Sequence, residues 1–346
     1  MTEPGRSGEP PNGFTVALCC HNSARRLPHT LQHLARQRVR ATVPWEVLLI
    51  DNASSDGTAD LARRQWPKGP PAPLHVFTEP TLGLGYARLR ALERAAYRFV
   101  AFVDDDNWLE PEWVDTAWET MTEHPEVGAL GGHSTAAFET PPPRWFSEFK
   151  TLYAVGPDDV PAGDITEHPG LLWGAGLTVR LAAWRGLRAK GYTPALVGRH
   201  GTALTAGEDT ELCLALRLAG WRLWYEPNLR LTHYCPAGRL TWRYARRLYR
   251  GSGAATPVHD AYYFALRAAT DPLPPSHKTW WWQAGATLWA LARRPADVAA
   301  RLRNREGDAR VTETEALLGR LGSLIRRRGA YDGAVRSIAA APWRAA

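Results

Sequence analysis

Short apolar segments alternate with helical patterns between residues 14 and 103. Apolar runs of strand length occur at four places: 14–19, 45–50, 74–77 and 99–103. The segments between them carry turn residues and helix caps, followed by apolar positions spaced as on one face of a helix. Strands that alternate with helices build a parallel sheet covered on both faces. We therefore predict an α/β fold with a mostly parallel sheet flanked by helices.

Three consecutive aspartates, Asp104, Asp105 and Asp106, follow directly after the apolar run 99–103. Open α/β sheets bind their ligands at the carboxyl ends of strands, which is where these side chains would lie. Carboxylates this close repel one another unless a cation or many hydrogen-bond donors hold them together. The triple aspartate therefore predicts a divalent-cation site.

Acidic residues also stand at the end of another predicted strand and at the start of a predicted helix. Asp51 ends the second predicted strand, where it could bind the N3–H of uracil or a ribose hydroxyl, or could form a turn. Glu208 and Asp209 open a helix predicted at 210–219, where an N-cap is the ordinary role and a general base is the alternative. The residues alone leave both questions open.

The order of these segments resembles the family 2 glycosyltransferases, which have the GT-A fold. The resemblance covers about residues 14–235 and depends on six short motifs, at 15–22, 47–58, 83–88, 102–107, 173–176 and 207–209. It implies a metal-dependent, inverting transferase of the hexosyltransferase type. Such an enzyme moves a sugar from a nucleotide-diphosphate donor, UDP or dTDP favoured, to the hydroxyl of a saccharide, a lipid-linked acceptor or a small molecule.

The resemblance also assigns roles to residues. It implies that Asp209 is the general base and that Glu208 contacts the acceptor. It implies Mg or Mn bound by Asp104 and Asp106, with His233 as a further ligand, although a core histidine is an equal reading of His233. The remaining donor-binding positions that it implies are Cys20, His21, Asn22, Asp51 and, in the variable middle place of the motif, Asp105.

Three more candidates follow from residue type and position. Arg88 stands near a helix start, where it suits a phosphate or the donor, and it replaces the third glycine that a dinucleotide fingerprint needs. We therefore exclude NAD binding. Trp173 could stack on an acceptor ring beside the small residue Gly174, with core packing as the competing interpretation.

Charge is unevenly distributed along the chain. Residues 239–346 hold 19 Arg or Lys against 8 Asp or Glu, whereas the first 238 hold 23 against 27. A basic, helical C-terminal region suggests an anionic partner such as membrane phosphate. Arginine dominance through genomic base composition is an equal explanation. We predict a disordered tail at 1–12, a GT-A domain at 13–240 and a mainly helical region at 241–346.

Several classes are excluded or disfavoured. The four cysteines lack the spacing of metal or disulfide motifs and are expected to be reduced and buried. The sequence has no apolar stretch of about 18 residues and no secretory h-region, which favours a cytoplasmic protein, peripheral to the inner face of the membrane if its basic tail binds lipid. We expect no nucleic-acid partner and leave oligomerisation open.

Two alternative functions stay open at this stage. The first is sugar transfer to a polyprenyl phosphate, which the basic C-terminal region favours. The second is a non-catalytic GT-A module that senses nucleotide sugars or acts as a scaffold. The presence of Asp104, Asp106 and Asp209 together argues against the second, because a binding module could dispense with the base.

Overall fold

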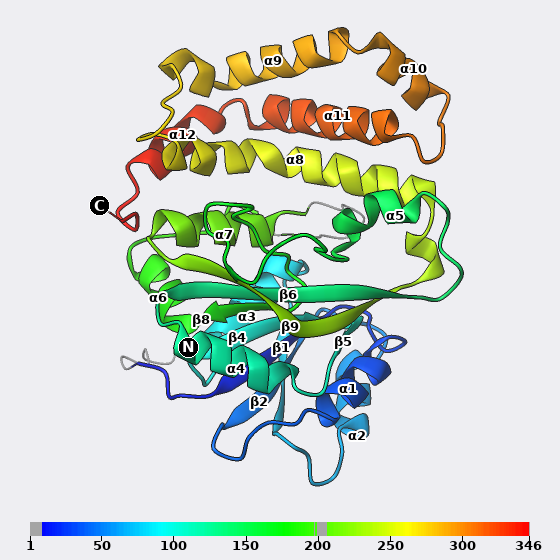
Figure 1. The fold of residues 1–346 in the computed structure, drawn as a ribbon, viewed down its shortest axis with the longest axis vertical. Helices are drawn as coiled ribbons and strands as arrows, with labels where there is room; N and C mark the ends of the chain where they lie inside the picture. Colours follow the sequence, from blue (N-terminus) through cyan, green and yellow to red (C-terminus); the bar gives the residue numbers. More distant parts are fainter. Residues whose placement is uncertain (1–8, 197, 199–205, 346) are drawn as a thin grey trace.

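The computed structural model describes residues 9–196, 198 and 206–345. A sheet lies across the middle of the molecule, with helices on both faces and a stack of further helices above it (Figure 1). Part of the predicted tail at 1–12 contacts the body, since Glu9 pairs with Arg98 at 2.9 Å. Residues 1–8 of that prediction lie outside the described residues.

The first half of the sheet is parallel, in the order β3-β2-β1-β4. Its strands are β1 (Phe14–Cys20), β2 (Trp45–Asn52), β3 (Leu74–Glu79) and β4 (Phe99–Asp104). They are connected by α1 (Leu27–Ala35), α2 (Thr58–Gln65) and α3 (Leu84–Arg94). Every residue of β1 is buried, because successive side chains point into different cores on the two faces. The predicted alternation is confirmed here.

The second half of the sheet is mixed and continues in the order β4-β8-β6-β9-β5, with β7 beside β9. The strands are β5 (Asn107–Leu109), β6 (Val127–Phe138), β7 (Gly163–Asp164), β8 (Leu177–Arg180) and β9 (Arg222–Cys235). Strand β9 is 14 residues long and continues on both sides of Pro227. A register shift between Gly132 and His133 of β6 lets the pairing continue past Pro227. This extension brings His233 into the sheet.

Helices cover both faces of the sheet. On one face α1, α2 and α4 (Trp113–Glu123) bury their apolar sides, and on the other α3, α6 (Leu181–Ala189) and α7 (Glu208–Leu218) do so. Short helices α5 (Phe146–Phe149) and η1 (Lys150–Tyr153) lie between β6 and β7. The carboxyl ends of β1, β2 and β4 and the start of α7 thus meet at one edge.

The C-terminal region is helical, as predicted, and its helices lie in layers above the sheet (Figure 1). They are α8 (Trp242–Leu266), α9 (Trp280–Ala292), α10 (Pro295–Leu302), α11 (Ala309–Arg327) and α12 (Tyr331–Ala339). Helix α8 shares the core of the sheet domain through Ala255, Val258 and Tyr262. The first of the layers is therefore part of the same apolar core as α7.

Helices α8 and α11 contact each other backbone to backbone. A Cβ atom on Gly253 would lie 2.0 Å from the carbonyl oxygen of Ala316, and one on Gly319 would lie 2.1 Å from that of Arg250. Larger residues would force the helices apart, at a typical overpacking cost of about 1–3 kcal/mol. The two glycines thus fix how closely the upper helices approach α8.

Two expectations about chain class are tested by the described residues. All four cysteines are buried and free of disulfides, as predicted. Within the described ranges, each helix is too short or too polar to cross a bilayer.

Candidate active site

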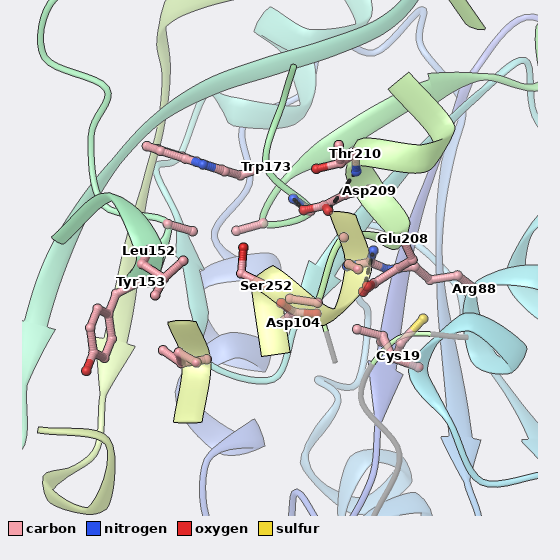
Figure 2. A pocket seen from close by; sticks show the side chains of 18 of the residues that line it. Cys19, Arg88, Asp104, Leu152, Tyr153, Trp173, Glu208, Asp209, Thr210 and Ser252 are labelled. Carbon is pink, nitrogen blue, oxygen red and sulfur yellow. Dashed lines mark hydrogen bonds and ion pairs between the residues drawn. The ribbon is translucent and has the colours of Figure 1, made fainter. Parts of the chain in front are cut away.

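A cavity of about 750 Å³ opens at the edge where the carboxyl ends of the parallel strands meet the start of α7. Figure 2 shows Asp104, Glu208, Asp209 and Ser252 around this cavity. Its walls come from the β1 and β4 ends, α3, the segment 171–175, the α7 start and one face of α8. The acidic positions separated by more than 100 residues in sequence therefore face one space, and the C-terminal region forms part of its wall.

The aspartates of the triple motif differ in their surroundings. Asp104 is half-buried at the end of β4 and lines the cavity. Asp105 is 7% exposed and binds Arg26 through Nη2 at 2.5 Å and Nε at 3.2 Å. Burial and the charge of Asp106 raise the pKa of Asp105, while Arg26 opposes that shift. The carboxylate of Asp105 thus anchors the start of α1, and its predicted contact with the donor stays a prediction.

Asp106 is surrounded by groups from β9 and the turn after it. Arg239 Nη1 lies 2.7 Å from Asp106 Oδ2, and His233 Nε2 lies 3.4 Å from Asp106 Oδ1. Arg239 Nη1 also lies 3.4 Å from His233 Nε2. His233 arrives here because Asn107 of β5 pairs with it across the sheet. A positive guanidinium therefore contacts the same two side chains that we predicted as metal ligands.

The geometry tests the metal prediction only in part. Two carboxylates and an imidazole are donors that suit Mn²⁺ or Mg²⁺. His233 Nδ1 is buried without a hydrogen-bond partner in the described part of the chain, so the polar contacts of the ring are those of Nε2 with Asp106 and Arg239. Among the residues that the structure describes, no three His, Cys, Asp or Glu side chains converge as a metal site would need. The ligand set remains a prediction.

The carboxylate of Asp209 is held by two backbone amides at the start of α7. Its Oδ2 accepts from the N–H of Gly174 at 2.8 Å, and its Oδ1 accepts from the N–H of Thr210 at 2.7 Å. Gly207, which precedes the helix, has φ +114°, a conformation that favours glycine. The two backbone N–H groups therefore fix the direction of the Asp209 carboxylate.

Arg88 connects α3 with α7 inside the cavity wall. It is 8% exposed, and its Nη1 lies 3.3 Å from Glu208 Oε1. Its guanidinium lies 5.1 Å above the ring of Phe102. Burial lowers the pKa of Arg88, but the charges of Glu208, Asp104 and Asp209 raise it more, so the net shift is upward. Arg88 is thus a fixed positive charge between the predicted metal-binding and base carboxylates.

The predicted acceptor residues lie beside this pair. Trp173 is half-buried and lines the cavity, on the side of Leu152 and Tyr153 (Figure 2). Gly174 also lines it, and a Cβ there would meet Arg88 Nη2 at 2.5 Å. Glycine at this position therefore makes room for the arginine. Contact of either residue with an acceptor stays a prediction.

The residues of the turn after β1, predicted to bind the nucleotide, have two different surroundings. Cys20 and His21 line the cavity, whereas Asn22 ties the turn to its neighbour through Ser54 Oγ and the N–H of Ser55, at 3.0 and 2.8 Å. The adjacent Cys19 lines the cavity too, and its pKa is raised to about 12 by burial, so its thiol is neutral. A neutral, buried thiol is a poor nucleophile.

Asp51 differs from its expected position. Among described residues its side chain does not line the cavity, whereas that of the next residue, Asn52, does. Asp51 Oδ1 is buried without a hydrogen-bond partner in the described ranges. The side chain of Asn52 binds the N–H of Gly83 at 2.8 Å and so connects the β2 end to the start of α3. Donor binding by Asp51 stays a prediction.

Sequence reasoning missed three contributors to the site: Arg26, Arg239 and the α8 wall that includes Ser252 and His259. Arg239 stands six residues after His233, a spacing with no motif of its own. The α8 residues carry helical periodicity alone, which does not say what a helix face will meet. Tertiary contact was needed to find them.

Family models agree with the geometry. Residues 15–171 match the model of Glycosyl transferase family 2. Residues 99–286, more than half of the chain, match that of Glycosyl transferase family group 2. The chain belongs to the family 2 glycosyltransferases. The resemblance that the sequence motifs indicated is therefore confirmed.

Individual relatives share a modest sequence identity with this chain. The family member described as glucosyl-dolichyl phosphate glucuronosyltransferase, from Haloferax volcanii, is 26% identical over 152 residues, which are 44% of this chain and 47% of that protein. This chain therefore spans about half the length of that relative.

Solved structures support the fold. The mannosyltransferase PcManGT from Pyrobaculum calidifontis, in complex with GDP-Man and Mn²⁺, is 20% identical, with 98% of this chain and 90% of that one covered and a TM-score of 0.50. S. aureus TarS 1–349 in complex with UDP-GlcNAc is 16% identical, with 92% of each chain covered and a TM-score of 0.50. The predicted GT-A fold is thus confirmed for this family 2 member.

His259 gives the site a testable pH response. Its Nε2 lies 2.9 Å from the carbonyl oxygen of Gly207, just before the helix that carries Asp209. Burial lowers the pKa of His259 below 6.5, partly offset by the Gly207 carbonyl and Asp209. A depressed histidine pKa contributes stability that is present above the unfolded value and lost as the pH falls below it.

We therefore expect that lowering the pH from about 7.5 to 5.5 reduces the free energy of unfolding more in wild type than in His259→Gln. The expected difference is at most about 1.4 kcal/mol over this range, because pH 5.5 lies only about one unit below the ordinary histidine pKa of 6.5 at which the unfolded chain takes up the proton. Urea unfolding at both pH values measures it, with the exposed His168→Gln as the matched control. Equal pH dependence in wild type and His259→Gln would contradict the assignment.

Proposed function

We propose that this chain is an inverting hexosyltransferase that moves a sugar from a nucleotide-diphosphate donor to a hydroxyl acceptor. The observation that carries the proposal is the shared cavity of Asp104, Arg88 and Asp209. Arg88 supplies a positive charge for a diphosphate, and Asp209 at the start of α7 supplies a carboxylate that a backbone amide holds in place. Family membership supports the same reaction class.

Asp209 is proposed as the general base. The acceptor oxygen attacks the anomeric carbon, its proton passes to Asp209, and the bond to the donor diphosphate breaks with its electron pair staying on the diphosphate oxygen. A single base on one side of the sugar gives inversion, because attack comes from the face opposite the leaving group. Glu208 is proposed as an acceptor neighbour that Arg88 holds in place.

Donor binding is proposed at the ends of β1 and β4. Cys20, His21, Arg88 and Asp104 line the cavity and support this assignment directly. The fixed charges of Arg88 and Arg239 suit a diphosphate, since guanidinium groups bind phosphate oxygens in a planar fork. UDP or dTDP remains the proposed nucleotide of the donor. Asn22, Asp51 and Asp105 are proposed to contribute to donor binding from the surrounding segments.

Metal dependence is part of the proposal. Asp104, Asp106 and His233 would hold Mg²⁺ or Mn²⁺, whose chemistry when bound is to stabilise the negative charge of the departing diphosphate. The Mn²⁺ in the PcManGT structure supports this assignment. Arg239 contacts Asp106 and His233, so the guanidinium and the divalent cation would have to share these two side chains.

The acceptor is proposed to bind between Trp173, Gly174 and the α8 wall. A saccharide ring could stack on Trp173, with Ser252 of α8 offering a hydroxyl opposite. Transfer to a polyprenyl phosphate is the alternative. The Haloferax relative is described as acting on glucosyl-dolichyl phosphate, in which a sugar is already linked to a polyprenyl phosphate, and this supports a lipid-linked acceptor. A non-catalytic module is disfavoured, because Asp209 keeps two amide donors that orient its carboxylate.

We further propose peripheral membrane contact through α9, with the protein on the cytoplasmic face. Trp281, Leu288 and Trp289 are 55%, 54% and 61% exposed, at a spacing that places them on one face of α9. Helix α9 is the outermost layer of the stack (Figure 1). Arg293 lies 4.6 Å from the ring of Trp289. Exposed tryptophans beside arginine suit the interface of an anionic bilayer.

The base assignment predicts that Asp209→Asn lowers turnover on the order of 10²- to 10⁴-fold while donor affinity stays within about twofold, because the amide cannot take the acceptor proton. Turnover is measured as nucleotide release and affinity by calorimetry. The matched control is Asp60→Asn on the exposed face of α2, which should keep full turnover. An Asp209→Asn enzyme with normal turnover would refute the base role.

The metal assignment predicts a Mn²⁺-dependent rise in melting temperature with one nucleotide from a panel of UDP, dTDP, GDP and CDP. Asp104→Asn should abolish the Mn²⁺-dependent part of that rise, because it removes a charged ligand, and chelator should do the same to wild type. Arg239→Met should weaken nucleotide binding both with Mn²⁺ and with chelator. A rise that is the same in chelator, or in Asp104→Asn, speaks against the metal.

The membrane assignment predicts that Trp281→Ser with Trp289→Ser reduces binding to vesicles that contain phosphatidylglycerol by about tenfold or more, since each buried tryptophan loses apolar contact with lipid. Cosedimentation of the full chain measures it. The control is Trp66→Ser, which changes a tryptophan on the opposite side of the sheet domain, at the end of α2. Wild-type binding that is no stronger than that of the double variant would end this proposal.

A further inference from the structure

A second hollow, of about 420 Å³, lies between α8, α10 and α11 and shares no lining residue with the active-site cavity. Its lining comprises five arginines, one asparagine and one glutamate: Arg243, Arg246, Arg247, Arg250, Arg301, Asn304 and Glu315. We call it the arginine hollow. The elements that line it, the end of α10 and the first turns of α8 and α11, lie at the right-hand end of the helical stack in Figure 1.

The arginines of α8 stand on one face of the helix. Positions 243, 246, 247 and 250 follow the spacing i, i+3, i+4 and i+7, so their guanidinium groups are neighbours. Like charges at this spacing destabilise a helix by a few tenths of a kcal/mol per pair. A sequence that places four of them together needs a compensating negative charge.

Glu315 is the acidic residue in the lining of the hollow. It is 3% exposed, and its carboxylate lies 2.6 Å from Arg246, 2.5 Å from Arg250 and 3.1 Å from Arg301. Arg246 is also held by Asn304 Oδ1 at 2.5 Å. One buried carboxylate therefore fixes the directions of three guanidinium groups, and the lining as a whole carries five positive charges against one negative.

Three other arginines of the same helical region each pair with one carboxylate. Arg294 pairs with Glu313, Arg310 with Asp308 and Arg320 with Asp260, at 2.7, 2.7 and 2.8 Å. The arginine hollow differs from these pairs, because its five arginines surround one glutamate. General arginine enrichment does not account for a single buried acid shared by three partners.

We propose that the arginine hollow binds a phosphate group, at a site separate from sugar transfer. A phosphate offers several oxygens and up to two negative charges, which matches preoriented guanidinium forks better than a carboxylate does. The phosphate belongs either to a lipid headgroup or to a soluble phosphate compound. Leu302 follows Arg301 directly and is 73% exposed, so an apolar side chain stands next in sequence to the hollow.

The test compares two double variants. The hollow variant carries Arg243→Gln and Arg247→Gln, and the α2 variant carries Arg63→Gln and Arg64→Gln. Both pairs are exposed and both remove two charges, but only the first lines the hollow. Calorimetric titration with inorganic pyrophosphate, in chelator, measures binding in the full chain. Any pyrophosphate bound at the transfer site contributes equally to both variants. Flotation with phosphatidylcholine vesicles, with and without phosphatidic acid, measures the lipid source.

We expect pyrophosphate affinity at one class of sites to fall on the order of tenfold or more in the hollow variant, because charged hydrogen bonds are lost, and to be unchanged in the α2 variant. If binding to phosphatidic-acid vesicles falls in parallel, the phosphate is that of a lipid. If only pyrophosphate binding falls, it is a soluble phosphate. Equal affinity and stoichiometry in wild type and both variants would overturn the proposal. Nucleotide binding at the transfer site should be normal in all of them.

Discussion

The guanidinium of Arg88 is buried between the parallel half of the sheet and the start of α7, and the geometry of the site depends on it. It contacts Glu208, packs over Phe102 of β4 and occupies the space that the absent side chain of Gly174 leaves. A buried cation is stable only when carboxylates surround it, and buried carboxylates need a cation in the same way. Arg88 therefore fixes the distance between the end of β4 and the helix that carries Asp209.

The same principle organises the other side of the cavity. Arg26 holds Asp105 against α1, and Arg239 holds Asp106 beside His233. The three consecutive carboxylates can thus be buried or half-buried together, because the start of α1 and the turn after β9 each bring an arginine to them. Asp104 is left as the member of the motif that faces the cavity, which suits a residue proposed to hold a metal and a diphosphate.

Helix α8 links the transfer site to the rest of the C-terminal region. It contributes Ser252 and His259 to the cavity, and it packs on α11 where Gly253 and Gly319 let the two backbones approach closely. The arginine hollow lies nearer the start of the same helix, at residues 243–250. Helix α8 packs against α11 and forms part of the cavity wall where the acceptor is proposed to bind. A ligand that moved α10 or α11 would therefore act on that wall.

The sequence by itself determined the alternating strands and helices of the first 104 residues, because apolar periodicity and strand ends are local properties. It also determined that Asp104, Glu208 and Asp209 would stand at element ends. Tertiary structure alone decided that Asn52 rather than Asp51 lines the cavity, since the pleat of β2 turns neighbouring side chains to opposite faces. It alone brought Arg26, Arg239 and α8 to the site, because those contacts join segments far apart in the chain, and no local pattern records which charges will meet.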